Sequence, residues 1–392
     1  MKFKLSNFNN TLFCFSLLSI FFPVKIYPII FLIASISFLL ERKKIILSPW
    51  IYFLVAYSVY AIASFIISGY YDELRVTNFY KILINFFFLI TAINWLYQKD
   101  VSRLIVMVDY TFHFTLFLVF VQLMLYHKDS NFQYLLGVSS SNEGTDIYNP
   151  NLYFWGLDTK NLFGARIATV GFPYILIGAA RFKKVSLSRI CIVCLLAFFS
   201  MSRTPILALI LGILYMFWNI PGKSIKISLF SIIAIATPAI LNNVFRLQTV
   251  TESNDGMGIR LMYWGAFFLN FNKISIFGNG FLAADKFLGQ YALFYLGEPN
   301  IHNTFLNNYL DFGIWGLTTY TLFLIYLFKY SKQTYNNKKY WITAFIPLLA
   351  TMMVLFPGYD NDIIIYLVLV SIVGQLKTFN YNNLSFSYKL NG

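Results

Sequence analysis

The sequence contains few charged residues. Only 12% of its 392 residues are Asp, Glu, Lys or Arg, about half the share of a typical soluble domain, whereas 58% are hydrophobic. Apolar runs recur along the chain at close to the ~20 residues that cross a bilayer as a helix. This composition excludes an ordinary soluble domain and indicates a polytopic membrane protein.

Cysteines and cofactor motifs are also scarce. The three cysteines, Cys14, Cys191 and Cys194, all lie in apolar runs, so none can form a disulfide in an extracytoplasmic loop. Cys191 and Cys194 spell C-x-x-C, but no His or carboxylate lies nearby, and packing explains them better than a metal. The sequence has no Walker loop, Rossmann fingerprint or His/Cys metal cluster. We therefore expect neither a cofactor nor a metal.

Apolar periodicity predicts an all-α fold with about twelve transmembrane helices. The expected spans are residues 11–24, 26–40, 48–68, 79–96, 103–126, 163–180, 189–202, 204–218, 226–242, 303–328, 340–357 and 363–376. They divide the chain into N-terminal helices (1–126), a loop (127–162), central helices (163–241), a second large loop (242–302), and C-terminal helices with a tail (303–392).

The formal net charge is +14, which in a soluble protein would suggest a nucleic-acid partner. Here the distribution of charge between loops explains it better, and no nucleic acid is expected. Nineteen of the 30 Lys and Arg residues lie in one set of alternate loops, which includes both termini. By the positive-inside rule both termini are cytoplasmic, so that loops 127–162 and 242–302 are periplasmic.

The loop 242–302 is too long and too polar to be a simple connector, and loops of this size usually carry function. It contains Arg260 and closes on His302, so we expect the two side chains to meet at one membrane edge. Its aromatic segment 259–271 is typical of a helix at the lipid interface. The loop 127–162 is polar and contains Asn149-Pro-Asn151, which suggests a turn-rich cap.

Three arginines are expected near the outer membrane surface. They are Arg166, Arg203 and Arg260, and together they suit a diphosphate because a planar guanidinium donates bidentate, charge-assisted hydrogen bonds. An arginine at membrane depth costs roughly 2.5 to 3.5 kcal/mol on insertion scales, so it usually pairs with or binds something. The alternative is that each arginine snorkels or contacts a lipid headgroup.

His302 is the one histidine of three that lies where the long loop meets a span. An imidazole there can take a proton from a sugar hydroxyl near neutral pH. The alternative is a histidine that bonds the backbone at the start of a helix. We expect Glu298 and Asn303 to contact substrate, as we do for Arg166; capping of the following helix is the structural alternative for Asn303.

Asp360-Asn-Asp362 resembles the D-x-D with which nucleotide-sugar transferases hold a metal. The predicted topology places it outside the membrane, where nucleotide sugars are absent. Acidic residues at a helix N-terminus explain it better.

Several short motifs, spread over about residues 160 to 320, resemble the O-antigen polymerase and O-antigen ligase superfamily. They are Ser202-Arg203-Thr204, Arg260 upstream of Phe277-Gly-Asn-Gly280, and His302-Asn303-Thr-Phe-Leu306 followed by Phe312-Gly-Ile-Trp-Gly-Leu317. Arg166 with Gly171 is similar to the family's R-x-x-x-x-G region, although Phe172-Pro173 replaces the expected Asn-Pro-Asn.

The resemblance implies a GT-C-like, metal-independent, inverting glycosyltransferase of the bacterial inner membrane. Its donor and acceptor would be undecaprenyl-diphosphate-linked glycans, and its partners membrane lipids and a chain-length regulator. Arg203 and Arg260 would neutralise the leaving diphosphate, and His302 would deprotonate the acceptor hydroxyl.

Three functions compete. A polymerase joins lipid-linked repeat units, a ligase transfers the glycan to lipid A core, and a transporter or flippase moves the lipid-linked sugar. Transport favours charges along a central path, yet only Asp109 and Asp311 fall within the expected spans. A ligase needs a basic surface for the phosphorylated core, whereas loop 242–302 carries four basic and four acidic residues. The charge pattern therefore favours the polymerase.

Overall fold

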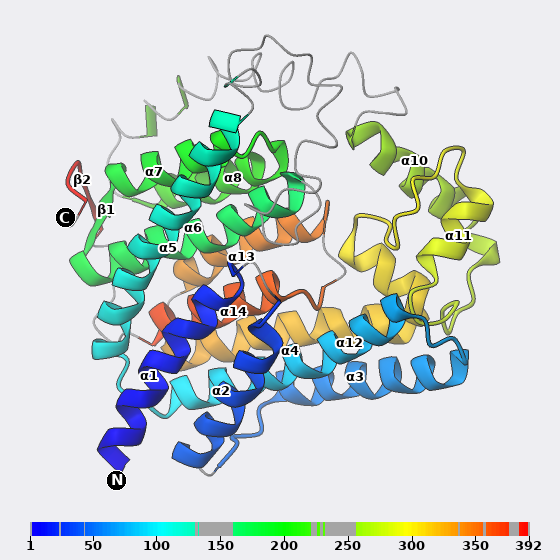
Figure 1. Ribbon diagram of the computed structural model, residues 1–392, viewed down its shortest axis with the longest axis horizontal. Coiled ribbons are helices and arrows are strands. Elements are labelled where there is room, and N and C mark those ends of the chain that lie inside the picture. Colours follow the sequence, from blue (N-terminus) through cyan, green and yellow to red (C-terminus); the bar gives the residue numbers. More distant parts are fainter. Residues whose placement is uncertain are drawn as a thin grey trace.

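The computed structural model describes residues 2–22, 25–42, 44–129, 132, 160–220, 226–227, 230–231, 256–335, 338–355, 358–375 and 384–390. This part of the chain is mainly α-helical (Figure 1). Its helices are α1 (Lys2–Ser19), α2 (Tyr27–Arg42), α3 (Pro49–Ser68), α4 (Glu73–Tyr97), α5 (Ser102–Asp129), α6 (Lys160–Phe182), α7 (Leu187–Phe199), α8 (Arg203–Asn219), α10 (Gly256–Leu269), η4 (Phe271–Lys273), α11 (Ala284–Tyr291), α12 (Thr304–Tyr335), α13 (Lys338–Met352) and α14 (Asn361–Gly374).

Every expected span except 226–242 overlaps a helix, although α1 lies earlier in the chain than the expected span 11–24. Most of segment 226–242 lies outside the described residues, as does most of loop 127–162 with Asn149-Pro-Asn151. Five helical stretches are long and apolar enough to cross a membrane: Pro49–Ser68, Glu73–Tyr97, Ser102–Lys128, Asn161–Phe182 and Thr304–Tyr330. The apolar parts of α7, α8 and α14 are shorter. The fold is thus that of a polytopic, helical membrane protein, and the number of twelve spans stays a prediction.

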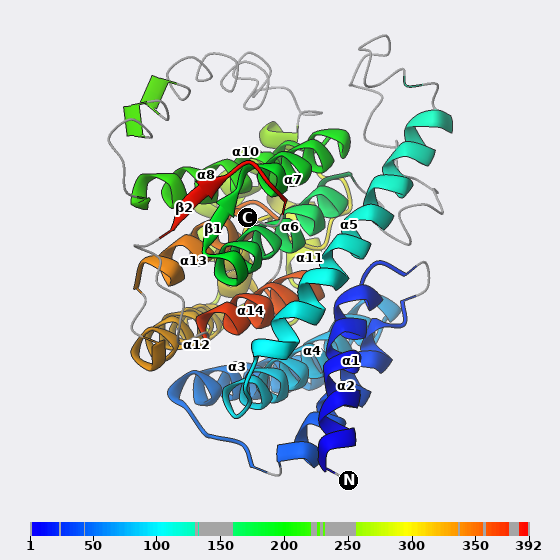
Figure 2. The ribbon, with the colours of Figure 1, turned by 90° about the vertical axis from the view of Figure 1, so that its left-hand side faces the viewer.

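The sequence did not predict the short pair of strands, β1 (Lys184–Ser186) and β2 (Ser385–Ser387). The two strands pair in parallel, with Val185 opposite Phe386. Three residues are too few to show the alternation by which a strand is recognised. The pairing holds the segment after α6 and the C-terminal segment at one end of the bundle (Figure 2).

The centre of the bundle is formed by α14, all of whose residues are buried. Such a helix, hydrophobic on every side, belongs inside the protein and not against lipid. It packs between α4 and α6. Farther out, α3 lies along α12 (Figure 1), and the two share aromatic contacts such as Phe53 on Tyr326, with ring centroids 5.1 Å apart.

Polar clusters lie at both ends of α6. Near its start, Arg166 contacts Asp362 at the beginning of α14 and the carbonyl of Ile20 just after α1. Near its end, Asp109 of α5 accepts hydrogen bonds from Arg181 at 2.7 Å and from Arg189. About four turns of helix separate Arg166 from Arg181, so the two clusters mark opposite ends of the bundle.

The helices α10 and α11 pack with the start of α12 around a small apolar core of their own. It contains Tyr263, Phe267, Phe287, Leu288 and Leu310. The helix expected over 259–271 is α10, and its outer residues Phe268 and Leu269 are 63% and 85% exposed. That pattern suits the expected position at the lipid interface, which stays a prediction.

The loop that contains Phe277-Gly-Asn-Gly280 packs against a kink in α12. Gly313 has φ 62° and ψ −154°, a conformation essentially confined to glycine. The break lets the N–H of Ile314 donate to the carbonyl of Ile276 at 2.9 Å, while Asn279 N–H donates to the carbonyl of Leu310 at 2.7 Å. The glycine motifs are therefore explained by close backbone contact between the loop and α12.

Replacing Gly313 with Ala should destabilise the protein strongly. A Cβ atom there would lie 2.0 Å from the carbonyl oxygen of Ile276, in addition to a backbone strain of about 1 to 3 kcal/mol. We expect a clear fall in the midpoint of thermal unfolding in detergent. Gly265→Ala in α10 is the control, because a Cβ atom at Gly265 meets nothing within 4 Å and alanine favours a helix. Equal midpoints for the two variants would contradict this role of the kink.

Candidate functional site

The backbone around His302 is held in an unusual conformation. His302 has φ +55°, in the left-handed region that non-glycine residues seldom adopt. Its N–H donates to Asn300 Oδ1 at 2.9 Å. Asn303 then caps α12, since its Oδ1 accepts from the N–H groups of Phe305 and Leu306 at 3.0 and 3.1 Å. Helix capping, the structural alternative for Asn303, therefore explains the role of its amide oxygen. The proposed contact of Asn303 with substrate stays a prediction.

The imidazole of His302 is oriented by a carboxylate and a tyrosine. Its Nε2 lies 2.7 Å from Glu298 Oε2. The ring is parallel to that of Tyr263, with centroids 5.9 Å apart and 1° between the planes. Within the described residues, the other nitrogen, Nδ1, is buried and has no hydrogen-bond partner. Donation from Nε2–H to Glu298 leaves the lone pair of Nδ1 available to accept a proton.

Glu298 stays ionised at neutral pH in this setting. Burial raises its pKa, but the hydrogen bond from His302 and the charges of His302 and Arg260 outweigh burial, so that the pKa lies below the usual value. Because the folded state lowers this pKa, the ionised carboxylate stabilises the protein when the pH is above the ordinary pKa of a glutamate. That contribution is lost as the pH falls through the lowered value. Burial also raises the pKa of Tyr263 to about 12, so this phenol keeps its proton.

Arg260 lies on α10, one turn before Tyr263 on the same helix face. The side chain is buried, and its Nε donates to the carbonyl of Val354 at 2.8 Å. Asn303 Nδ2 donates to the neighbouring carbonyl of Met353 at 3.3 Å. The segment that follows α13 therefore anchors both Arg260 and Asn303. Glu298 interacts electrostatically with both Arg260 and His302. The expected meeting of these two side chains at one membrane edge stays a prediction.

Arg166 is placed differently. It is buried in α6, and its Nε and Nη2 lie 2.8 and 3.3 Å from the two carboxylate oxygens of Asp362. Lys81 of α4 forms an ion pair with one carboxylate oxygen of Asp360. Both carboxylates of the D-x-D are thus bound by cationic side chains. Asp360 is the N-cap residue of α14 and Asp362 lies in its first turn, so the expected place at a helix N-terminus is confirmed. Asp360 makes no side-chain capping hydrogen bond, and the ion pairs are an additional role of both residues.

Arg203 is the first residue of α8, and its side chain lies outside what the structure describes. Its proposed contact with a diphosphate stays a prediction.

Sequence reasoning missed Tyr263, although its spacing of three residues from Arg260 places both on one helix face. It also missed the ion pairs of Lys81 with Asp360 and of Arg166 with Asp362. Arg166 and Asp362 are 196 residues apart in sequence, so no local pattern connects them.

Asp362→Asn should destabilise the protein by about 3 to 5 kcal/mol, because it leaves the buried guanidinium of Arg166 without its charge partner. Asp72→Asn is a suitable control. Asp72 pairs with Arg75, but its side chain is 47% exposed, and asparagine preserves its cap on α4. Chemical or thermal unfolding in detergent measures both. A loss for Asp362→Asn no larger than for the control would show that the buried pair does not stabilise the bundle.

Residues 190–321 match a protein-family model described as O-Antigen ligase. The match runs from α7 into α12 and contains Arg203, Arg260, Glu298, His302 and Asn303, whereas Arg166 lies before it. No curated protein matches the chain significantly. Members of the matched family are enzymes of the glycosyltransferase type that act on lipid-linked glycans. Through residues 190–321, about a third of the chain, the match supports the resemblance to the O-antigen polymerase and ligase superfamily.

Proposed function

We propose that the protein is an O-antigen polymerase, which joins undecaprenyl-diphosphate-linked repeat units at the periplasmic face of the bacterial inner membrane. The observation that carries the proposal is the pair of His302 and Glu298 beside Arg260. This pair presents an imidazole nitrogen without a partner among the described residues, next to a buried positive charge. A proton acceptor and a cation are the two groups that transfer from a diphosphate donor requires.

In the proposed reaction, Nδ1 of His302 takes the proton of the acceptor hydroxyl. The acceptor oxygen attacks the anomeric carbon of the donor sugar, and a new C–O bond forms. The bond from that carbon to the diphosphate oxygen breaks at the same time, and the diphosphate leaves with the electron pair. Attack opposite the leaving group inverts the anomeric configuration.

Glu298 and the arginines have distinct parts in this scheme. The ionised carboxylate of Glu298 holds the Nε2–H tautomer and stabilises the imidazolium that forms, as the aspartate does in a Ser-His-Asp triad. Arg260 and Arg203 would stabilise the charge on the leaving diphosphate. Because both carboxylates of Asp360-Asn-Asp362 are bound to Lys81 and Arg166, the proposed chemistry uses guanidinium groups and no metal.

The proposed sidedness follows from the two ends of the bundle. Arg166, Asp362 and Lys81 gather at the end near His302, because Asn303 and Arg260 bind the segment that leads to α14. At the other end, β1 pairs with β2 and Lys99 donates to Ser6. The second end thus contains the basic segments around Lys99 and Lys184 together with the described segments nearest both termini, which supports cytoplasmic termini and a periplasmic site.

The ligase remains the second candidate, because the matched family model is described by that activity. The transporter has less support. Asp109 is paired with two arginines, and Asp311 accepts hydrogen bonds from Ala283 N–H at 2.9 Å and from Asn307 at 3.0 Å. Both carboxylates within the spans therefore have protein partners and do not form a line of unpaired charges.

His302→Gln should abolish polymer formation while the protein stays folded and binds the donor, since an amide donates and accepts hydrogen bonds but cannot take the proton. Glu298→Gln should lower kcat by about 100- to 10,000-fold, because the carboxylate positions the imidazole and stabilises its charged form. The measurement is elongation of purified lipid-linked repeat units in proteoliposomes, with donor binding measured separately.

Asn272→Gln is the matched control, because Asn272 is exposed in the same loop and does not belong to the group formed by His302, Glu298, Arg260 and Asn303, which we call the His302 group. It should elongate at the wild-type rate. Substantial turnover by His302→Gln would rule out His302 as the base. Full activity of Glu298→Gln would show that the carboxylate does not position the imidazole.

A further inference from the structure

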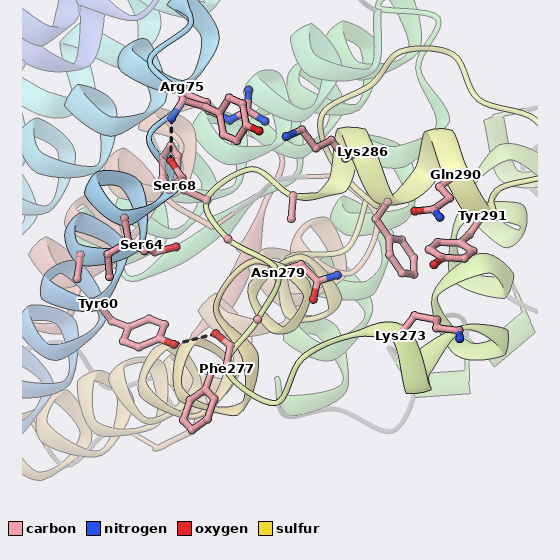
Figure 3. A pocket seen from close by; sticks show the side chains of 18 residues that line it. Tyr60, Ser64, Ser68, Arg75, Lys273, Phe277, Asn279, Lys286, Gln290 and Tyr291 are labelled. Carbon is pink, nitrogen blue, oxygen red and sulfur yellow. Dashed lines mark hydrogen bonds between the residues drawn. The ribbon is translucent and has the colours of Figure 1, made fainter.

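A hollow, shown in Figure 3, lies apart from His302, Glu298, Arg260 and Asn303. It is about 660 Å³ in volume and is formed between the end of α3, the start of α4 and residues 273–291. Its volume falls in the range of about 300 to 1,000 Å³ that is usual for small-molecule sites. Neither His302, Glu298, Arg260 nor Asn303 lines it. The hollow, which we call the basic cavity, therefore needs its own explanation.

The basic cavity is lined by Arg75, Lys273 and Lys286 and by no carboxylate. Figure 3 shows the side chains of Arg75 and Lys286 converging. Both contact the ring of Tyr70, with the Nζ of Lys286 3.7 Å and the Cζ of Arg75 5.7 Å from its centroid. Arg75 has Asp72 as a partner, but within the described residues no carboxylate pairs with either lysine. The cavity thus concentrates positive charge suited to an anion.

The rim of the basic cavity is apolar. Ile67 and Phe277 both line it, and they are 84% and 69% exposed. Ile67 lies in the last turn of α3, which is long and apolar enough to cross the membrane. The cavity is therefore expected at the depth of the lipid headgroups, with apolar side chains beside it where acyl or prenyl chains would lie. A ligand that fits both features has a phosphorylated head and an apolar tail.

The basic cavity is also connected to the His302 group through the small apolar core. Ala283 and Phe287 line the cavity and belong to that core. Tyr263, which stacks on His302, belongs to it as well. One packed unit, built from α10, α11 and the start of α12, thus carries the proposed base and forms part of the wall of the basic cavity.

We propose that the basic cavity binds the phosphorylated head of a second membrane lipid, which in the polymerase is the diphosphate of the acceptor glycan. This inference rests on the proposed function, because a polymerase has two lipid-linked substrates in the same leaflet. In this scheme the donor diphosphate lies at Arg260, which interacts with Glu298 beside His302. The acceptor diphosphate lies in the basic cavity, and its glycan extends past the small apolar core to Nδ1 of His302.

The test measures how many molecules of undecaprenyl diphosphate, without a glycan, bind to the protein in phosphatidylcholine nanodiscs. Native mass spectrometry counts the bound lipid over a range of concentrations. Wild-type protein should bind two. The double variant Lys273→Gln/Lys286→Gln should bind one in the same range, with the other site weakened at least about ten-fold by the loss of charge-assisted hydrogen bonds. Both lysines are exposed, so the double variant should fold.

Lys329→Gln is the matched control, because Lys329 is also exposed and has its Nζ 5.5 Å from the ring centroid of Tyr326, but it does not line the cavity. It should bind two molecules, as should Lys286→Arg, which keeps the charge. Competition with phosphatidylglycerol identifies the source of the headgroup. Resistance to this competitor supports the acceptor lipid, and equal displacement supports an ordinary anionic phospholipid at the same site.

Unchanged binding in the double variant would overturn the proposal for the basic cavity. This outcome is distinct from failure of the proposed function, because binding is measured without any glycan transfer. A protein that elongates glycans but binds lipid diphosphate equally well in the double variant retains its function and loses the cavity site. A protein that loses one bound lipid in the double variant but forms no polymer retains the cavity site and loses the function.

Discussion

The position of the site depends on the backbone hydrogen bonds between the loop at 276–280 and the kinked start of α12. Gly313 opens the helix so that Ile314 N–H reaches the carbonyl of Ile276, and Gly278 allows the two backbones to approach closely. This contact holds the large loop against a helix that also packs along α3. His302 lies directly before α12, so its place relative to α10 and α11 is set by the same contact.

The segment after α13 fixes the site from the other side. The carbonyls of Met353 and Val354 accept from Asn303 and Arg260, and a few residues later Asp360 and Asp362 pair with Lys81 and Arg166. Five parts of the chain distant in sequence are thereby joined at one end of the bundle. A rigid support of this kind holds the ring of His302 in one direction, which the proposed role as a base requires.

Much of the fold could be predicted from the sequence, because helices that span a membrane can be recognised from their composition and length alone. The arginine and histidine of the long loop were also expected to meet. Partners of single charges were not foreseeable: nothing in one sequence marks Asp362 as the partner of Arg166, or shows that Asp109 is paired with Arg181 and Arg189. The β1–β2 pair and the left-handed conformation of His302 likewise depend on tertiary contacts that no local pattern encodes.

In the proposed reaction, two lipid-linked glycans react with each other at His302. The most direct measurement supplies purified protein in proteoliposomes with lipid-linked repeat units alone and separates the products by length. A polymerase yields a ladder of products that differ by one repeat unit. The absence of a ladder from the donor alone, followed by a single transfer once lipid A core is added, would contradict the account and assign the protein as the ligase.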